Sequence, residues 1–296
     1  MLVSLAAFFF LGQSAPADTF AAYRAAAEKL DSAGYSTVRA WSAYYHVPPA
    51  ERLGSVEPPK EPDGRALPVP AGLYADSTYL DYCVVVKGVS ADGLKGLATA
   101  NAGPVPSGPA DPALARVLAE LNEAAEETAF AEFASGQSAA GTNYLLDALA
   151  ANRRWMQAGK EAANASLADD SGLFEAFAQA LPGMAEADLV KADDACARLV
   201  KTPGQNQVES GDLGAARTVD AVRFRLLRVE VALQRFEREY RQFPKKLEEL
   251  NRNDLILDPL TGKTFQYEAI PFSGYRLFSA GGSAVLRISL DGGEAR

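Results

Sequence analysis

The side chains that most often perform chemistry are few in this chain of 296 residues. It contains one histidine, His46, and two cysteines, Cys83 and Cys196. A zinc site built from histidine and cysteine needs more ligands than these, and a Ser-His-Asp triad would have to use His46 itself. His46 ends a helical pattern just before two prolines, so we predict that it lies at a helix end and is not catalytic.

Pairs of adjacent acids could support carboxylate chemistry instead. They are Glu126–Glu127, Asp169–Asp170 and Asp193–Asp194. Their neighbours in the sequence are helix caps or polar helix faces, so we predict that these acids are solvated charges. An exported hydrolase that uses carboxylates is the alternative function. It would require two inward-facing acids in one pocket with raised pKa values.

The two cysteines allow two arrangements. Cys83 lies in the strand-like run "YLDYCVVVKG", and Cys196 lies on the apolar side of the helical run "LVKADDACARLV". An even cysteine count permits a disulfide in an oxidising compartment. Two separate buried thiols are the other arrangement, since a free cysteine packs as a small hydrophobic side chain. The sequence leaves both open.

The first twenty residues, "MLVSLAAFFFLGQSAPADTF", have the pattern of a secretory signal. An apolar run at 2–11 is followed by Ala15-Pro16-Ala17, which matches a cleavage site before Asp18. The run is shorter than the roughly 20 residues that span a bilayer. We therefore predict a signal peptide at 1–17, a mature chain without a membrane span, and a periplasmic or extracellular location.

The composition argues against some classes of binding partner. The formal net charge of -9 does not favour nucleic-acid binding, which depends on neutralising phosphates. Neither a metal-ligand pattern nor a glycine-rich nucleotide loop is present, so we expect no cofactor. With 48% hydrophobic residues, the chain can bury a sizeable core, and its length allows two domains.

Residues 18–211 are predicted to form a mainly helical domain. Apolar residues recur there at spacings of three and four, and short loops between such segments indicate an antiparallel bundle. Thr142 and the pair Asp170-Ser171 are candidate helix caps, as is Asp111 before Pro112. Proline-rich loops are expected at 48–72 and 101–112. The segment 73–100 between them could form one or two strands, or a strand and a helix.

Residues 212–296 are predicted to form a second module that begins with a long helix. Its apolar stripe continues to the helix end, which must precede Phe243-Pro244. The stripe comprises Val219, Val222, Leu226, Val229, Leu233, Phe236 and Tyr240, and Phe224, Leu227 and Val231 widen it. We favour a core helix over a coiled-coil dimer. Its many arginines are expected to form a solvated face that pairs with acids of the bundle.

The stretch "EREYRQFPKKLEELNRNDLILDPLTGKTFQYE" at 237–268 places several elements close together. A short helix is expected at 245–250, a turn at Asp258-Pro259 and Gly262, and strands at 264–270, 275–279 and 283–291. The predicted fold class is therefore α+β, mostly α: an antiparallel helical bundle followed by a long helix packed on a small antiparallel β-sheet.

Residues from about 215 to 296 resemble the C-terminal domain of the major pseudopilin of type II secretion. The segments "ALQRFEREYRQFPKKLEEL", "DPLTGKTFQYE" and "GYRLFSAG" carry the resemblance. The signature residues are Tyr240, Phe243, Pro244, Leu247, Leu250, Asp258, Pro259, Gly262, Tyr267 and Tyr275, with Gly274, Ser279 and Gly281. The family's helix-stopping glycine is replaced, because Arg241 and Gln242 stand in that step, and Leu260 stands where an aromatic residue is usual.

The resemblance implies an exported protein that acts through a protein partner in the cell envelope. A link to a type II secretion or pilus-like system would follow. The family's calcium loop carries several acids, whereas this chain offers none there before Asp291, so we predict no calcium site of that kind. Taken with the scarcity of catalytic side chains, this makes a non-enzymatic protein the preferred function.

Overall fold

A computed structural model describes residues 20–46, 57–106, 112–158, 160–200, 212–270 and 274–279. These residues form eight α-helices and a two-stranded antiparallel sheet, so the fold is α+β and mostly α, as predicted. The helices are α1 (Ala21–Ser32), α2 (Tyr35–His46), α4 (Tyr79–Ala102), α5 (Pro112–Ala134), α6 (Ser138–Ala158), α7 (Lys160–Ala180), α8 (Glu186–Val200) and α9 (Asp212–Tyr240). The strands are β1 (Gln266–Ile270) and β2 (Gly274–Phe278), and short 3-10 helices occupy η1 (Leu181–Gly183) and η2 (Leu247–Leu250).

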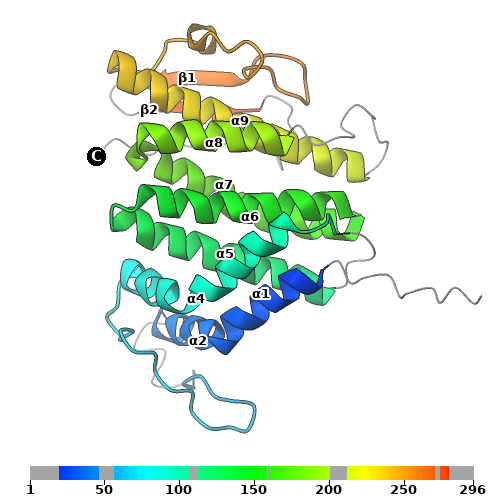
Figure 1. Cartoon of the computed structure of the whole chain (residues 1–296). Helices are drawn as coiled ribbons and strands as arrows, with labels where there is room; N and C mark the ends of the chain where they lie inside the picture. Colours follow the sequence, from blue (N-terminus) through cyan, green and yellow to red (C-terminus); the bar gives the residue numbers. More distant parts are fainter. Residues whose placement is uncertain are drawn as a thin grey trace, which may run out of the picture.

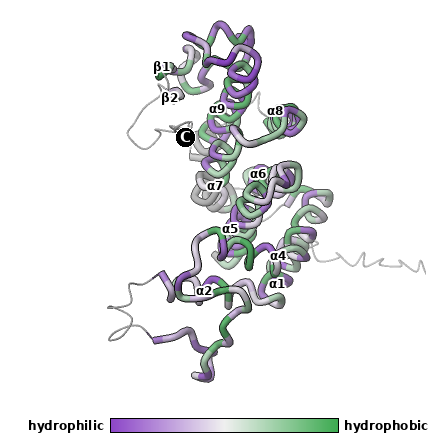
Figure 2. Tube along the Cα trace, turned by 90° about the vertical axis from the view of Figure 1, so that its left-hand side faces the viewer, coloured by the Kyte–Doolittle hydropathy of each residue, from purple (hydrophilic) through white to green (hydrophobic). Residues whose placement is uncertain are grey.

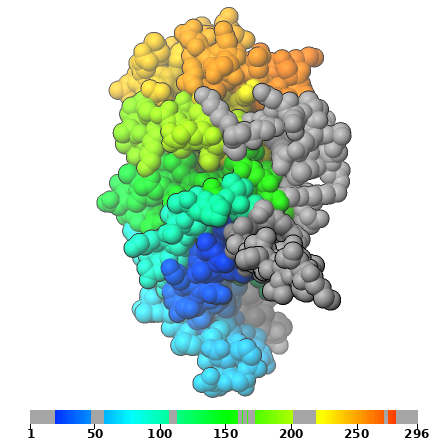
Figure 3. Space-filling view, turned by 45° about the vertical axis from the view of Figure 1, so that its right-hand side comes forward, coloured from blue at the N-terminus to red at the C-terminus, as the bar shows by residue number. Residues whose placement is uncertain are grey.

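The elements stack in layers along one long direction (Figure 1). Helices α1, α2 and α4 form one end, α5, α6 and α7 lie in the middle, and α8 and α9 separate them from the sheet. In the space-filling view of Figure 3 the light-blue segment before α4 lies at the bottom, the N-terminal helices lie above it, and the C-terminal module is at the top. Elements that follow one another in sequence mostly lie in contact, as short loops between helices dictate.

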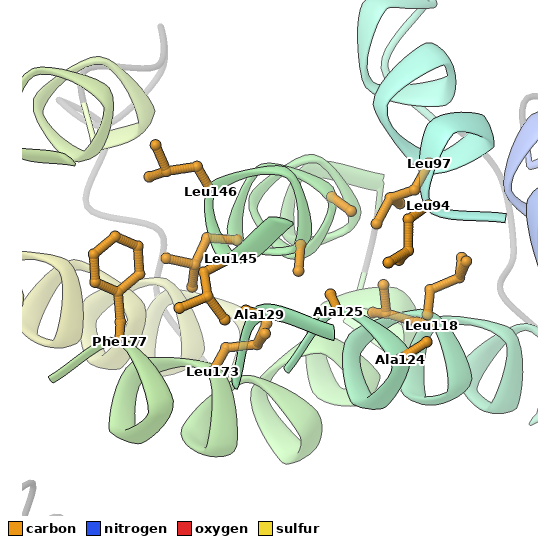
Figure 4. Close-up of a cluster of buried hydrophobic side chains, with 14 of the residues drawn as sticks. Leu94, Leu97, Leu118, Ala124, Ala125, Ala129, Leu145, Leu146, Leu173 and Phe177 are labelled. Atoms are coloured by element: carbon orange, nitrogen blue, oxygen red, sulfur yellow. The ribbon is translucent and has the colours of Figure 1, made fainter. Parts of the chain in front are cut away.

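Leucine and alanine side chains fill the core between the middle helices (Figure 4). Leu118 on α5, Leu145 on α6 and Leu173 on α7 are fully buried, and Ala124 and Ala125 lie between them. Small alanines on adjoining faces let the helices approach closely, which explains why an alanine-rich sequence still builds a dense core. Along the chain, hydrophobic and hydrophilic residues alternate within most helices (Figure 2).

One helix, α4, replaces the strands expected around Cys83. Its start is fixed by a capping box, in which the Thr78 side chain accepts from the Asp81 backbone and Asp81 accepts from the Thr78 backbone. The run of three valines after Cys83 suggested a strand by local propensity. The buried positions of α4 instead recur at helical spacing, and tertiary packing overrides propensity.

Two predicted helix starts are also wrong. Thr142 lies inside α6, which begins at Ser138 directly after a turn at Gly136 with a φ angle of 78°. Helix α7 runs through residues 170–171 without interruption. Capping residues are found inside helices as well as at their starts, so neither motif alone marks the start of a helix. Of the two proline-rich segments, the structure describes 57–72 and 103–106, and neither of these stretches contains a helix.

Helix α9 contributes to two hydrophobic cores. One row faces the sheet and is buried in the core of the C-terminal module, namely Val222, Leu226, Val229 and Leu233. A second row is buried in the core of the helical bundle, namely Phe224, Leu227 and Val231. The apolar stripe is therefore largely covered within one chain, as expected for a core helix. Helix α9 therefore packs against both the bundle and the C-terminal sheet.

Two arginines of α9 pair with acids of α8, and a third binds a backbone carbonyl oxygen. Arg228 donates to Asp193 on α8 at 2.6 Å, and Arg235 donates to Glu186 at 2.6 Å. Arg238 donates to the carbonyl oxygen of Met184 at 2.5 Å, just after η1. These contacts attach α9 to the first half of α8 and to the turn before it.

The sheet follows the predicted alternation. Tyr267 pairs with Leu277 and Glu268 with Arg276 in the antiparallel register. Tyr275 and Leu277 are buried against α9, while Arg276 is exposed. The third predicted strand, at 283–291, lies outside the described residues.

Candidate functional site

The aspartate of the predicted turn holds the C-terminal module together. Asp258 is fully buried, and its carboxylate accepts from the Leu260 backbone at 2.8 Å and the Ser279 hydroxyl at 2.7 Å. Pro259 follows it in the turn, and Gly262 takes the predicted positive φ angle of 67°. Because Ser279 lies directly after β2, this aspartate fastens the turn to the sheet. Both oxygens of the Asp258 carboxylate are engaged in hydrogen bonds within the module, so its role is structural.

The remaining signature residues pack or make turns. Phe243 stacks edge-on against Tyr275 with ring centroids 4.8 Å apart, and the Tyr267 hydroxyl donates to the Pro244 carbonyl oxygen at 2.7 Å. Two leucines of η2 join the same core, Leu247 fully and Leu250 partly. Tyr240 differs, since it is 53% exposed and stacks on Phe236 of the same helix. The signature is therefore a structural unit in this chain.

The two cysteines and the histidine are not arranged for catalysis. Cys83 on α4 and Cys196 on α8 are both buried free thiols, so the structure has the second of the two arrangements left open above. Burial raises the pKa of each thiol to about 12, which keeps both protonated at neutral pH. His46 is the exposed last residue of α2, and its Nδ1 atom lies 2.7 Å from the Ser42 carbonyl oxygen.

One acid pair departs from the prediction of solvated charge. Glu127 on α5 is half-buried, and its two carboxylate oxygens accept from separate phenols. The Tyr35 hydroxyl of α2 donates at 2.9 Å and the Tyr82 hydroxyl of α4 donates at 2.7 Å. Burial raises the pKa of Glu127, and the two hydrogen bonds partly oppose that rise. Because the two tyrosines lie 92 and 45 residues away in sequence, no local pattern could have identified this cluster.

The two remaining pairs of adjacent acids do not form a comparable cluster among the residues that the structure describes. Asp193 binds Arg228 at 2.6 Å and Arg252 at 3.3 Å, and Asp194 is exposed. The side chains of residues 169 and 170 lie outside the described residues. Within the described part of the chain no group of three or more His, Cys, Asp or Glu residues could hold a metal ion. Among those same residues no helix has the length and apolarity to cross a bilayer.

A buried ion pair joins the bundle to α9. The Arg153 guanidinium of α6 binds the Asp220 carboxylate of α9 and also donates to the Leu199 carbonyl oxygen at 3.0 Å. Burial raises the pKa of Asp220 to about 6, and the Arg153 charge opposes that rise. Both side chains are at most 5% exposed, so solvent does not reach the pair. A carboxylate enclosed in this way fastens two layers of the fold and has no access to a substrate.

Four large apolar side chains on α4 and α5 are exposed to solvent instead of packed. Tyr79 is 50% exposed, Leu80 40%, Val84 54% and Phe130 43%. The rings of Tyr79 and Phe130 stack with centroids 5.3 Å apart, which joins α4 to α5. Leu80 and Val84 are four residues apart on α4 and so lie on one face. We call these four residues the α4–α5 apolar surface.

Sequence reasoning missed this surface because it expected strands in part of α4. In a strand, Leu80 and Val84 would also share a face, so their spacing alone could not distinguish the two structures. The contact between Tyr79 and Phe130 spans 51 positions in sequence and depends on how α4 packs against α5. An exposed cluster of this kind on a monomer is typical of a contact site.

Three surface hollows accompany these features. One of about 670 Å³ lies between α1 and α4, and its lining includes several alanines as well as Lys29, Lys95 and Asp92. The others, of about 570 and 800 Å³, lie along α9 and beside β1. Glu127 lines none of these three. The raised-pKa carboxylate is therefore not placed in any of them.

Neither a family model, nor a curated protein, nor a solved structure matches this chain. The resemblance of residues 215–296 to the pseudopilin domain stays a prediction from the sequence pattern.

Proposed function

We propose that this protein is a non-enzymatic exported protein of the cell envelope that acts by binding another protein. The observation that carries the proposal is the α4–α5 apolar surface, where Tyr79, Leu80, Val84 and Phe130 are each at least 40% exposed. Single exposed apolar residues are normal on protein surfaces, but three of these four lie within six residues of α4, and the Tyr79 ring contacts the Phe130 ring of α5, which favours a contact site.

The alternative, a hydrolase that uses carboxylates, has weaker support. Its strongest candidate, Glu127, uses both carboxylate oxygens to accept from tyrosine hydroxyls that connect α2, α4 and α5. Its neighbour Glu123 binds Arg39 at 2.5 Å. Both acids thus have partners that explain them structurally. A general acid or base would need an open approach for a substrate, and the three hollows described lie elsewhere.

Export and a link to a type II secretion or pilus-like system belong to the same proposal. They rest on the signal-like sequence at 1–17 and on the pseudopilin-like pattern of the C-terminal module. The signature residues build a helix-on-sheet unit with a buried Asp258 turn, which agrees with that pattern without identifying it. We expect the mature protein to begin at Asp18 and to be found outside the cytoplasm. Intact mass and cell fractionation would check this, and a cytosolic chain that retains Met1 would contradict it.

The contact function is tested by site-specific photocrosslinking in living cells. A photoreactive phenylalanine analogue replaces Val84 in one version of the chain. In the control version it replaces Val190, which is also an exposed valine, 38% accessible, but lies on α8 away from the cluster. We expect position 84 to give a discrete protein adduct, identified by mass spectrometry, and position 190 to give none. The same adducts from both positions, or none from position 84, would overturn the proposal.

A further inference from the structure

We propose that the exposed face of α4 binds the same face of a second copy of this chain, with the two helices antiparallel. This inference rests on the proposed contact function and names the protein that is bound. Leu80 and Val84 of the α4–α5 apolar surface belong to this face. The pairing follows from the exposure of α4 and from the positions of its charged residues.

The outer face of α4 is uncovered among the described residues. Exposed residues recur there at helical spacing and so share one face: Leu80, Asp81, Val84, Gly88, Ala91, Asp92, Lys95 and Thr99. The opposite face, which includes Val86 and Leu97, is buried in the bundle core. The centre of the outer face consists of Val84, Gly88 and Ala91, without a charged side chain, and Val84 is 54% exposed. A surface helix normally has a polar outer face, so an apolar centre indicates a further packing partner.

Gly88 lies at the middle of this face and leaves room for a second helix. A β-carbon built on it would meet nothing within 4 Å. Figure 1 shows α4 crossing in front of α5 and α6, with no described helix in front of it. Val84 lies four residues before Gly88 and Ala91 three residues after it. In an antiparallel pair that crosses at Gly88, the valine of each copy therefore contacts the alanine of the other.

The charged residues of the face are placed symmetrically about Gly88. Asp81 lies seven residues before it and Lys95 seven residues after it. Seven residues make nearly two turns, so both side chains point within about 20° of the direction of Gly88. Asp92 points about 40° away from that direction, toward the edge of the face. In the antiparallel pair, Asp81 of each copy lies opposite Lys95 of the other, which gives two equivalent ion pairs.

Both members of this ion pair are available in the single chain. Asp81 caps α4, but the two hydrogen bonds that it accepts from Thr78 both go to its Oδ2 atom, at 2.8 Å each. Lys95 is exposed, and no ion pair joins it to another described residue. Lys87 on the side of the helix differs, since it binds Glu132 of α5 at 2.7 Å.

This symmetry favours a second copy over a different protein. A foreign helix would need an acid, an open centre and a base at matching intervals and in the opposite order. A second copy carries that pattern necessarily, and opposite charges across the contact fix its direction. One pair of helices makes a small interface, so we expect a weak dimer with a dissociation constant of about 10–100 µM.

Sedimentation velocity of the whole mature chain tests the association at about 5–500 µM. We expect a reversible equilibrium between monomer and dimer. Raising the salt from about 50 to about 200 mM should weaken the dimer, because exposed ion pairs are screened. A chain that stays monomeric over the whole concentration range would overturn the inference.

Paired variants localise the contact. Val84→Ser should weaken the dimer by about tenfold, whereas Val190→Ser, at an exposed valine of α8, should leave it unchanged. Lys95→Glu places an acid opposite Asp81 and should also weaken the dimer by about tenfold. Lys191→Glu on α8 makes the same change of net charge at another exposed lysine and is its control. Equal effects within either pair of variants would overturn the assignment to α4.

Photocrosslinking from position 84 separates this inference from the proposed function. We expect the adduct formed in cells to consist of two copies of this chain, with twice the mass of one chain. A discrete adduct with a different protein would leave the contact function standing and would overturn the second copy as the occupant. The absence of any adduct at position 84 would overturn both.

Discussion

At the scale of single residues, two side chains hold conformations or contacts that their type does not favour. Arg241 ends α9 in the left-handed region with a φ angle of 58°, where glycine is the usual residue. Glu127 keeps a carboxylate in a half-buried position between two phenols. Each feature lowers the stability of the folded chain and is maintained by the structure around it. A substitution that removes it should therefore change the free energy of unfolding.

Arg241→Gly is expected to stabilise the protein. The substitution removes the clash of a β-carbon in the left-handed region, and the net gain should be about 0.5–1 kcal/mol after the entropy that glycine loses on folding. Urea unfolding of the purified chain measures it. Gln242→Gly is the matched control, because Gln242 is exposed and does not share the positive φ angle, so glycine there should destabilise. Equal effects of the two substitutions would show that the backbone at Arg241 is not strained.

Glu127→Gln is expected to change the pH dependence of stability. The folded-state pKa of Glu127 is raised above its ordinary value of 4.5, so the folded chain holds this proton more firmly than the unfolded chain. Its contribution to stability is therefore lost as the pH rises from about 4.5 through the raised pKa. The free energy of unfolding of the glutamine variant, relative to wild type, should increase between pH 4 and pH 7.

An aspartate with the opposite shift gives the control for that measurement. Hydrogen bonds from Thr78 lower the pKa of Asp81, so its contribution is present above its ordinary pKa of 3.8 and is lost as the pH falls. Asp81→Asn should therefore become less stable relative to wild type as the pH rises from 3.5 to 7. Denaturant titrations over this range check both signs. A flat difference for Glu127→Gln would mean that the carboxylate is as well solvated as in the unfolded chain.

At the scale of elements, the contact between α1 and α4 depends on a missing side chain. A β-carbon on Gly93 would lie 2.4 Å from Cδ2 of Leu30, which is fully buried on α1. Gly93→Ala should therefore push the two helices apart and destabilise the protein by about 1–3 kcal/mol. Gly88→Ala on the same helix meets nothing within 4 Å and should stabilise by about 1 kcal/mol through helix propensity. Thermal unfolding followed by circular dichroism would reveal the opposite signs. A stable Gly93→Ala would mean that α1 can shift without loss.

At the scale of the whole molecule, α9 makes the bundle and the C-terminal module interdependent. Its two apolar rows lie in different cores, so loss of the module would leave one row uncovered, and loss of α9 would open both cores. Truncation before residue 212 is consequently not a clean way to remove the module. Point substitutions in the module are better suited to measure the coupling.

Leu277→Ala on β2 tests this coupling. The leucine is fully buried, so the substitution should cost about 2–5 kcal/mol in the module. The two tryptophans, Trp41 and Trp155, both lie in the bundle core and report on that part alone. We expect the tryptophan fluorescence midpoint in denaturant to fall with the substitution. Leu257→Ala, at a leucine that is 43% exposed in the same module, should leave it nearly unchanged. An unaltered tryptophan midpoint in Leu277→Ala would show that the two cores unfold separately.

Helices α8 and α9 and both described strands could be predicted from local pattern, because each is long or regular enough for hydrophobic periodicity to identify it. Helix α4 could not, since its valine run has strand propensity and its helical packing partners are distant in sequence. The helix starts predicted at Thr142 and at 170–171 were wrong for a similar reason. A local capping motif is present at each position, but the helix continues through it. Candidate sites followed this rule: the Asp258 turn was found, while the Glu127 cluster and the α4–α5 apolar surface were not.

The sequence by itself determined the fold class, the long helix and the turn and strands that follow it, because these depend on contacts between near neighbours. It also predicted a compartment, through the pattern at 1–17. Only the tertiary structure decided that Glu127 binds Tyr35 and Tyr82, that α9 serves two cores, and that four apolar side chains on α4 and α5 are uncovered. The reason is that the burial of a side chain depends on which distant segments of the chain come into contact, and the packing of the helices determines those contacts.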